Sequence, residues 1–285
     1  MKMESLMRLT NISNNKEKNM YEKELKKMIE AAKKAQEWIL DVYHTDFEVI
    51  TKEDNSPVTN ADKGADKIIR DMLSKAFPDY GFLTEESKDT KERLTKEYIF
   101  VIDPVDGTKE FVSRNGQFTT NIALVHKHEV VAGVINIPML DIVYFASKGD
   151  GAYKLKNGGE KIKIHVSDRT ENLRAVRSCS FFNEKEKSIY EKHPELYASI
   201  NPLGAAMKFC FIADGQADIS YRCSAGTKEW DVAAGDIILT EAGGVMLVPP
   251  EMKEMTYNRE DVYNRQGYVT ANKKGSVNSN GDEWG

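Results

Sequence analysis

Two aspartates, Asp103 and Asp106, stand three residues apart directly behind an apolar run at residues 98–102. A run of this kind is typical of a buried strand, so both carboxylates are expected at one end of that strand. Gly107 and Thr108 follow at once and add bare backbone N–H groups and a hydroxyl. Hard cations prefer oxygen ligands, and glycine lets an anion approach the backbone closely. The motif therefore predicts a place where a metal ion and a phosphate meet.

Further acidic residues also fall at the predicted ends of elements. Glu85 and Glu86 follow a short strand-like run, and Asp231 opens a predicted helix. Carboxylates at strand ends can converge on one crevice, and several of them with a carbonyl favour Mg²⁺ or Mn²⁺. Taken singly, each has an ordinary interpretation as a turn, a solvated pair or a helix cap. The sequence has no cluster of His and Cys with the spacing of a zinc site.

The backbone between the two aspartates also suits ligand binding. Pro104 restricts the chain, so that the carbonyl of Val105 can face the same side as the carboxylates. If a helical turn begins behind Gly107, its free N–H groups favour a phosphate.

Two helices precede this motif. Residues 21–43 carry apolar side chains at the helical period, and residues 60–77 do the same until Pro78. Thr59 and Asp62 have the spacing of a capping box, although Asp is a weaker partner there than Glu. Strands are predicted over residues 81–84, 98–102, 118–126, 129–137, 142–147 and 161–166. The first half is thus helices followed by consecutive antiparallel strands.

The second half alternates between strands and helices. Strands are predicted over residues 174–179, 217–222, 245–248 and 267–271, and helices over residues 183–193, 205–214 and 230–242. We place a domain boundary within residues 166–172, which divides an N-terminal α+β half (19–168) from a C-terminal α/β half (169–271). The polar residues 1–18 and 272–285 are predicted to be flexible tails.

Composition argues against several classes of function. The 285 residues include 40 basic and 45 acidic ones, and a net charge of -5 gives no sign of nucleic-acid or anionic-membrane binding. We expect no signal peptide, and no stretch of about 18 apolar residues suggests a membrane span. The three cysteines lack metal-type spacing, which indicates a reducing compartment and ordinary interior packing. A cytoplasmic protein is therefore expected.

Four segments, taken together and in order, resemble the inositol monophosphatase superfamily of lithium-sensitive, Mg²⁺-dependent phosphatases. They are Pro57-Val58-Thr59-Asn60-Ala61-Asp62, Thr84-Glu85-Glu86-Ser87, the run from Asp103 to Thr108, and Trp230-Asp231-Val232-Ala233-Ala234 ending in Glu241-Ala242-Gly243-Gly244. The resemblance extends over residues 21–271. It implies a layered αβαβα sandwich with an N-terminal α+β half and a C-terminal α/β half, which the order of the predicted elements also fits.

Within the superfamily, one branch is the most similar. The segments Gly107-Thr108-Lys109-Glu110-Phe111, Arg114 to Thr119, Asn121-Ile122-Ala123-Leu124 and Met207-Lys208-Phe209-Cys210 look like the 3'(2'),5'-bisphosphate nucleotidases of the bacterial CysQ type. Inositol phosphatases usually carry an Asn-Phe pair after Gly-Thr, where this chain has Lys109 and Glu110. These two residues also have a plainer interpretation, as exposed charges that begin a short helix.

The resemblance implies a role for each residue of the predicted site. Glu85, Asp103, the carbonyl of Val105, Asp106 and Asp231 would bind two or three Mg²⁺ ions, with Mn²⁺ as an alternative. Asp62 and Thr108 would orient and deprotonate the attacking water, and Asp62 would bind a further metal or its water. Substrate contacts are implied for Glu85, Gly107, Thr108, Lys208, Arg222 and Asp231.

The function implied is hydrolysis of the 3'-phosphate of adenosine 3',5'-bisphosphate, by metal-activated water, to AMP and phosphate. Lys208 and Arg222 suit a second phosphate, although each has a plainer interpretation as a surface residue. Trp230 is expected in the core or against the base of the nucleotide. Sulfur assimilation is the pathway to which the resemblance points. Peripheral contact with the inner membrane, known for some relatives of this type, stays open for this chain.

Two other functions remain open at this point. Nucleotidases often carry a Ser where this chain has Ala205, which leaves room for an inositol- or sugar-phosphate phosphatase of the same superfamily. A metal-dependent nucleotide sensor that kept the fold without the activity is the alternative outside the enzymes.

Overall fold

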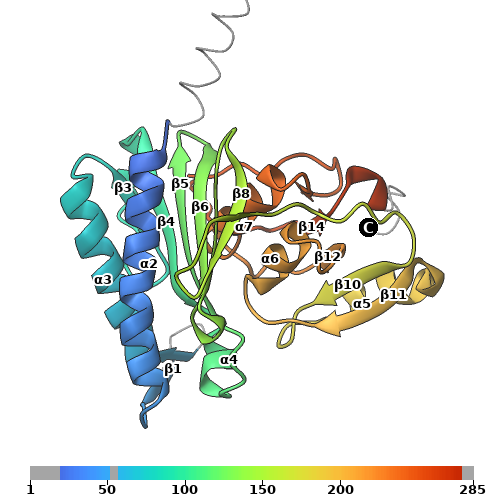
Figure 1. Ribbon diagram of the computed structural model, residues 1–285, viewed down its shortest axis with the longest axis horizontal. Helices are drawn as coiled ribbons and strands as arrows, with labels where there is room; N and C mark the ends of the chain where they lie inside the picture. The colour runs from blue at the N-terminus through green and yellow to red at the C-terminus, as the bar shows by residue number, and fades with distance from the viewer. Residues whose placement is uncertain (1–19, 52–56, 278–285) are drawn as a thin grey trace, which may run out of the picture.

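Two amphipathic helices begin the part of the chain that the computed structural model describes, which is residues 20–51 and 57–277. Helix α2 (Glu22–Tyr43) and helix α3 (Asn60–Ala76) lie side by side on one face of a large sheet (Figure 1). Each buries one apolar stripe, and the two stripes include Met28, Ala35, Ile39, Ala65, Ile69 and Leu73. A small antiparallel hairpin, β1 (Val49–Thr51) with β2 (Pro57–Thr59), stands between them in the chain.

The large sheet has seven strands in the order β3-β4-β5-β6-β7-β8-β9. They are β3 (Gly81–Thr84), β4 (Tyr98–Asp106), β5 (Thr119–His126), β6 (Glu129–Ile137), β7 (Ile142–Ser147), β8 (Gly151–Lys156) and β9 (Ile162–Lys163). Strands β4 to β9 form an antiparallel meander, whereas β3 runs parallel to β4. Because parallel strands end at the same edge, the last residues of β3 and β4 meet there.

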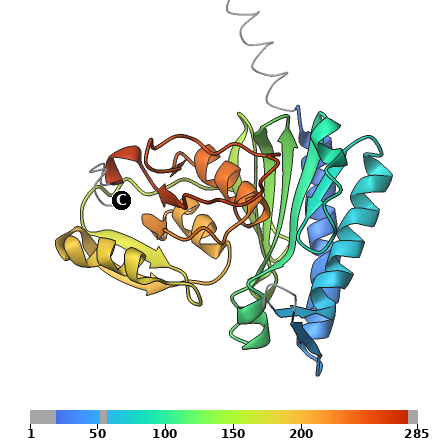
Figure 2. The same ribbon diagram turned by 180° about the vertical axis from the view of Figure 1, so that it is seen from behind.

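A smaller sheet has five strands in the order β11-β10-β12-β14-β13. They are β10 (Leu173–Arg177), β11 (Tyr197–Pro202), β12 (Ile219–Arg222), β13 (Val245–Leu247) and β14 (Tyr268–Ala271). Helices α6 (Met207–Ala213) and α7 (Glu229–Glu241) lie between the two sheets, and α5 (Glu184–Lys192) packs on the other side of the small sheet (Figures 1 and 2). Short 3-10 helices are η1 (Glu92–Thr95), η2 (Pro138–Leu140), η3 (Pro194–Leu196) and η4 (Lys274–Ser276).

Apolar side chains fill the spaces between the layers. Alternate residues of β5 show how one strand serves two of them: Ile122 and Leu124 pack towards α2 and α3, and Ala123 and Val125 pack towards α7. A third apolar cluster lies between the small sheet and α5. The layers therefore follow the order helix, sheet, helix, sheet, helix, and the predicted αβαβα sandwich is confirmed.

The strands that the sequence pattern misses lie outside the centre of the sheets. Strand β11, at one edge of the small sheet, has mostly exposed side chains and therefore shows no apolar alternation. Strand β8 is mostly half-buried and contains lysines, so it does not show the apolar alternation of a predicted strand either. The strand predicted at residues 161–166 is reduced to β9, because the chain then leaves the large sheet. The sequence pattern also does not predict β1 and β2, which pair with each other between α2 and α3.

Residues 164–172 connect the two sheets, at the place of the predicted boundary. The division into two halves stays a prediction, since one apolar cluster around α7 draws on both. The flexible tail predicted from residue 272 needs correction at its start. Asn272 is fully buried and donates to the carbonyls of Ser167 and Arg169, and Val277 packs into the cluster under α5. Residues 278–285 and the tail predicted at 1–18 lie outside the described residues.

Two further expectations concern location and the cysteines. Within residues 20–51 and 57–277, no helix has both the length and the apolar character that crossing a membrane requires. The cytoplasmic location and the inner-membrane contact stay predictions. Interior packing holds for Cys210, which is buried, whereas Cys179 and Cys223 are only half-buried.

Candidate active site

Strand β4 supplies two carboxylates because its pairing with β5 is interrupted. Asp103 pairs with Asn121 and Asp106 pairs with Thr119, and the register shifts between these pairs. The strand thus runs past its predicted end at residue 102 and carries the two intervening residues as an irregularity. Bulges of this kind re-aim side chains beside active sites. Asp103 is buried, and its Oδ1 accepts a hydrogen bond of 3.1 Å from the N–H of Val105.

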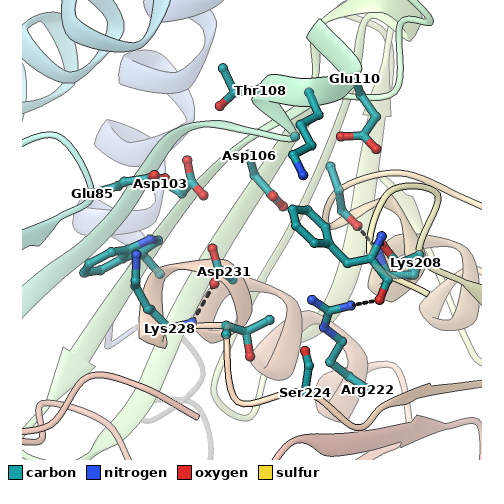
Figure 3. A pocket seen from close by; sticks show the side chains of 18 of the residues that line it. Glu85, Asp103, Asp106, Thr108, Glu110, Lys208, Arg222, Ser224, Lys228 and Asp231 are labelled. Carbon is teal, nitrogen blue, oxygen red and sulfur yellow. Dashed lines mark hydrogen bonds between the residues drawn. The ribbon is translucent and has the colours of Figure 1, made fainter. Parts of the chain in front are cut away.

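Helix α7 supplies a third carboxylate from its first turn. The Oδ2 of Asp231 accepts a hydrogen bond of 2.6 Å from the N–H of Lys228, which helps to cap the helix. One oxygen from each of Asp103, Asp106 and Asp231 lies within 4.8 Å of the other two (Figure 3). The convergence expected from the sequence is therefore observed for these three carboxylates, which come from distant parts of the chain.

Glu85 reaches the same cleft from the end of β3. Its N–H donates a 3.2 Å hydrogen bond to the carbonyl of Ile102, which extends the parallel pairing of β3 with β4. Its charge raises the pKa of each of the three clustered aspartates. Glu85 thus lines the cleft beside them, although it is outside the group whose oxygens all lie within 4.8 Å.

Burial and mutual repulsion make this cluster unfavourable as a set of bare anions. Burial, with the neighbouring carboxylates, raises the pKa of Asp231 to about 8. The pKa of Asp106 rises to about 6, mainly by burial, although the charge of Lys208 lowers it. Burial also holds the pKa of Asp103 well above its usual range. Carboxylates in this situation are stable as anions only beside a cation, and their hard oxygens fit Mg²⁺.

Asp62 and Thr108 meet beside the cluster. In the first turn of α3, Oδ2 of Asp62 accepts hydrogen bonds from the N–H and the hydroxyl of Thr59, at 2.8 and 2.7 Å. The predicted capping box of Thr59 and Asp62 is confirmed. The hydroxyl of Thr108 lies 3.2 Å from Oδ1 of Asp62 and 3.3 Å from the carbonyl oxygen of Val105. The carboxyl group beside the Thr108 hydroxyl is therefore that of a buried aspartate, and burial raises its pKa.

A left-handed residue turns the chain from β4 into the short helix α4 (Thr108–Val112). Gly107 has φ 88° and ψ 44°. A Cβ at this position would lie 3.1 Å from the Cβ of Ala205 and 3.2 Å from the carbonyl oxygen of Gln117. Both the conformation and the space therefore require glycine. The helical turn expected behind Gly107 is present, and Gly107 and Thr108 both line the cleft.

Cationic side chains line another part of the cleft. Arg222 ends β12, and its Nη1 donates a 2.8 Å hydrogen bond to the carbonyl of Phe181 and lies 3.8 Å from the buried Glu186. Lys208, in α6, donates a 2.6 Å hydrogen bond to the carbonyl of Ala205. Their plainer interpretation as surface residues is wrong, because the side chain of Arg222 is only 11% exposed and Lys208 is half-buried. Figure 3 shows both across the cleft from the aspartates.

The pair Lys109 and Glu110 divides between two environments. Glu110 is buried and accepts a 2.6 Å hydrogen bond from the hydroxyl of Ser180, so its interpretation as an exposed charge is wrong. Lys109 is exposed, as that interpretation expects, but it lines the cleft with its Nζ 4.1 Å from the ring centre of Phe181. Trp230 belongs to the core cluster, as expected, and it also lines the cleft, whereas its contact with the base stays a prediction.

Sequence reasoning missed the loop at residues 178–183. This loop contributes Ser178, Phe181, Phe182 and Asn183 to the lining of the cleft. No motif marks it, and the only local signal is a pair of aromatic residues directly before a good helix N-cap, Asn183. The complete cleft has a volume of about 660 Å³, which is in the range of sites for small molecules.

Comparison with known proteins shows which family the chain is similar to. A model of the inositol monophosphatase family matches residues 20–280. The 3'(2'),5'-bisphosphate nucleotidase CysQ of Aggregatibacter actinomycetemcomitans is 34% identical over 249 residues, which cover 86% of this chain and 91% of that protein. The protein of the same name from Escherichia coli strain K12 is 36% identical over 222 residues, covering 77% of this chain and 88% of its own length.

A solved structure extends the likeness to three dimensions. The crystal structure of CysQ from Bacteroides thetaiotaomicron, described as a bacterial member of the inositol monophosphatase family, superposes with a TM-score of 0.76. Its sequence identity is 32%, and the match covers 87% of this chain and 96% of the CysQ chain.

Proposed function

The chain belongs to the inositol monophosphatase family, and on that premise we propose that it is a Mg²⁺-dependent 3'(2'),5'-bisphosphate nucleotidase. The observation that carries the proposal is the division of one cleft between a cluster of carboxylates and a group of cations. A substrate with one phosphate needs only the carboxylate part, with its metal ions. A substrate with two phosphates uses both parts, and adenosine 3',5'-bisphosphate is such a substrate.

In this proposal the carboxylate part holds the metal ions. Asp103, Asp106 and Asp231 would hold Mg²⁺, assisted by Glu85 and the carbonyl of Val105, and Mn²⁺ could replace it. Two or three ions would share the site. When bound, such ions lower the pKa of water and neutralise the phosphoryl oxygens and the leaving oxygen.

The protein itself positions the reacting groups. The hydroxyl of Thr108, held 3.2 Å from Asp62, orients the attacking water on the side of the 3'-phosphate. Asp62 accepts the proton through this hydroxyl, and the raised pKa of its buried carboxyl makes it a stronger base than an exposed aspartate. The backbone N–H groups of Gly107 and Thr108 bind the phosphoryl oxygens. Lys208 and Arg222 bind the phosphate that stays on the product AMP.

A preference test separates this function from its two alternatives. We expect kcat/KM for adenosine 3',5'-bisphosphate to exceed that for inositol 1-phosphate by about tenfold or more, since each well-placed charge contact contributes about that factor. Asp103→Asn is the inactive control, and Li⁺ should inhibit the wild type. Preference for inositol 1-phosphate would favour an inositol- or sugar-phosphate phosphatase, the alternative left open because Ala205 has no hydroxyl for the nucleotide. Tight nucleotide binding in Mg²⁺ without turnover would indicate a sensor.

A further inference from the structure

Phe181 stands out among the apolar residues of the described part of the chain. Of the large apolar side chains that are exposed there, it is the one that lines the cleft, and 51% of its surface is accessible. Exposing an aromatic ring to water contributes nothing to folding, whereas covering it with a ligand is favourable. The position therefore suggests that a substrate covers the ring.

Hydrogen bonds within its own loop and from strand β12 hold the backbone of Phe181. Its N–H donates a 3.1 Å hydrogen bond to the hydroxyl of Ser178, and its carbonyl accepts the 2.8 Å hydrogen bond from Arg222. The preceding residue, Ser180, donates to the buried Glu110 at 2.6 Å. Phe181 thus lies on a loop that is already held in place, so binding of a ligand to its ring carries little entropic cost for ordering the loop.

Two cations accompany the ring. The Nζ of Lys109 lies 4.1 Å from the ring centre, and the Cζ of Arg222 lies 5.4 Å from it. Lys208 lines the same cleft, and Figure 3 shows it on the side of Arg222. A ligand that extends from the carboxylates to Phe181 therefore contacts both positive charges and an aromatic ring.

We propose that Phe181 is the platform against which the base of the substrate packs, and that Lys109 joins Arg222 in binding the phosphate that is not removed. The proposal rests on the proposed function and specifies it. A base and a second phosphate are attached to one ribose, so their partners in the protein must be neighbours, as these three residues are. An inositol or sugar phosphate would leave the ring of Phe181 uncovered.

Binding of AMP tests the platform apart from catalysis, because AMP has the base and the 5'-phosphate but not the reacting phosphate. We expect calorimetry in Mg²⁺ to show Phe181→Ala raising the Kd of AMP about 5- to 100-fold, the range for loss of one base–aromatic contact. Phe181→Trp should bind within about threefold of the wild type, since any aromatic face can serve. Lys109→Met should raise the Kd about tenfold and reduce its salt dependence.

Turnover supplies the second arm. The ratio of kcat/KM for adenosine 3',5'-bisphosphate to kcat/KM for ribose 3,5-bisphosphate, which lacks the base, should fall about 5- to 100-fold in Phe181→Ala. Ile200→Ala is the matched control, because Ile200 is an exposed apolar residue on β11 that does not line the cleft. This variant should leave the ratio and the Kd unchanged.

The outcomes separate the platform from the function. If the wild type does not hydrolyse adenosine 3',5'-bisphosphate, the proposed function fails, while weakened AMP binding in Phe181→Ala would still support the platform. If the wild type hydrolyses it and Phe181→Ala changes neither the Kd nor the ratio, the platform alone is wrong. Failure of the wild type to bind AMP would overturn the platform, as would an equal loss of activity with both substrates.

Discussion

At the residue scale, the carboxylate oxygens of the cleft have two different roles. Asp103, Asp106 and Asp231 crowd their oxygens within 4.8 Å, which suits a cation and little else. Asp62 instead has both oxygens engaged by hydroxyl and N–H donors, Thr59 on one side and Thr108 on the other. The first arrangement gathers positive charge, and the second controls the position of one hydroxyl.

The role of Thr108 can be tested separately from metal binding. Thr108→Ala removes the hydroxyl that lies 3.2 Å from Asp62 and leaves the three clustered carboxylates in place. We expect kcat to fall about 100-fold or more, the usual effect of removing a group that assists proton transfer, with Mg²⁺ affinity retained. Thr108→Ser keeps a hydroxyl and should recover most of the activity. Full activity of Thr108→Ala would mean that the hydroxyl does not handle the attacking water.

At the element scale, helix α7 matters because it packs unusually close to the large sheet while its first turn carries Asp231. A Cβ on Gly133 of β6 would lie 2.5 Å from the Cγ2 of Ile237 and 2.8 Å from the carbonyl oxygen of Ala234. The distance between helix and sheet is therefore set by the absence of a side chain. Since Asp103 and Asp106 belong to this sheet, the same distance helps to set the spacing of the carboxylates.

Gly133→Ala tests this contact. The added methyl would meet helix backbone that cannot yield easily, so we expect the free energy of unfolding to fall by about 1–3 kcal/mol. Activity should fall as well, through displacement of Asp231. Gly275→Ala is the control, because no atom lies within 4 Å of a Cβ built there. Urea denaturation measures the stability and kcat/KM the activity. Equal stability and equal activity of the two variants would show that Gly133 does not set the distance between helix and sheet.

A second contact of α7 predicts a pH dependence. Asp236 is 8% exposed, and its Oδ2 accepts a 2.6 Å hydrogen bond from the hydroxyl of the buried Tyr257. Burial raises the pKa of Asp236 to about 7 from 3.8, and the charge of Glu254 adds to this. A carboxyl group whose pKa is higher in the folded than in the unfolded protein stabilises the fold at pH values below its unfolded pKa. This contribution is lost as the pH rises through its folded pKa.

We therefore expect the free energy of unfolding to fall as pH rises from about 4 to about 7, by roughly 4 kcal/mol at most from this group. Asp236→Asn should flatten that slope, because an amide does not titrate. Urea denaturation of both proteins across this pH range, in saturating Mg²⁺, gives the difference between their slopes. Identical slopes would show that Asp236 titrates normally in the folded protein.

At the scale of the whole molecule, the cleft lies where the layers meet. The large sheet supplies Asp103 and Asp106, the middle helices supply Lys208 and Asp231, and the small sheet supplies Arg222. Any ligand that binds all of them joins both sheets through the helices between them. Binding at the cleft is therefore expected to stabilise the fold as a whole.

Mg²⁺ removal tests this coupling. Saturating Mg²⁺ should raise the melting temperature above that in chelator by roughly 5 °C, the effect of a ligand at about 100 times its Kd on a chain of this size. A bound cation would offset the burial and the repulsion that together raise the pKa of Asp106 and Asp231. In Asp231→Asn the shift should be less than half as large. A melting temperature that does not respond to saturating Mg²⁺ would contradict the proposed metal site.

The sequence by itself determined which groups form the carboxylate part of the cleft. Asp103 and Asp106 lie at the end of strand β4, Gly107 follows it, and Asp231 lies in the first turn of a helix, so local pattern places them at element ends. The capping box at Asp62 and the layered order of helices and strands are likewise short-range information, because period and cap residues act within a few positions.

Only the tertiary structure decided what surrounds that cluster. Glu110 and Phe181 are unremarkable as sequence, and their roles arise because a loop from the second half of the chain is hydrogen-bonded to α4 in the first half. The edge strand β11 is specified by pairing with β10 and not by its own side chains. Contacts between segments far apart in the chain depend on how whole layers pack, and no pattern within either segment records them.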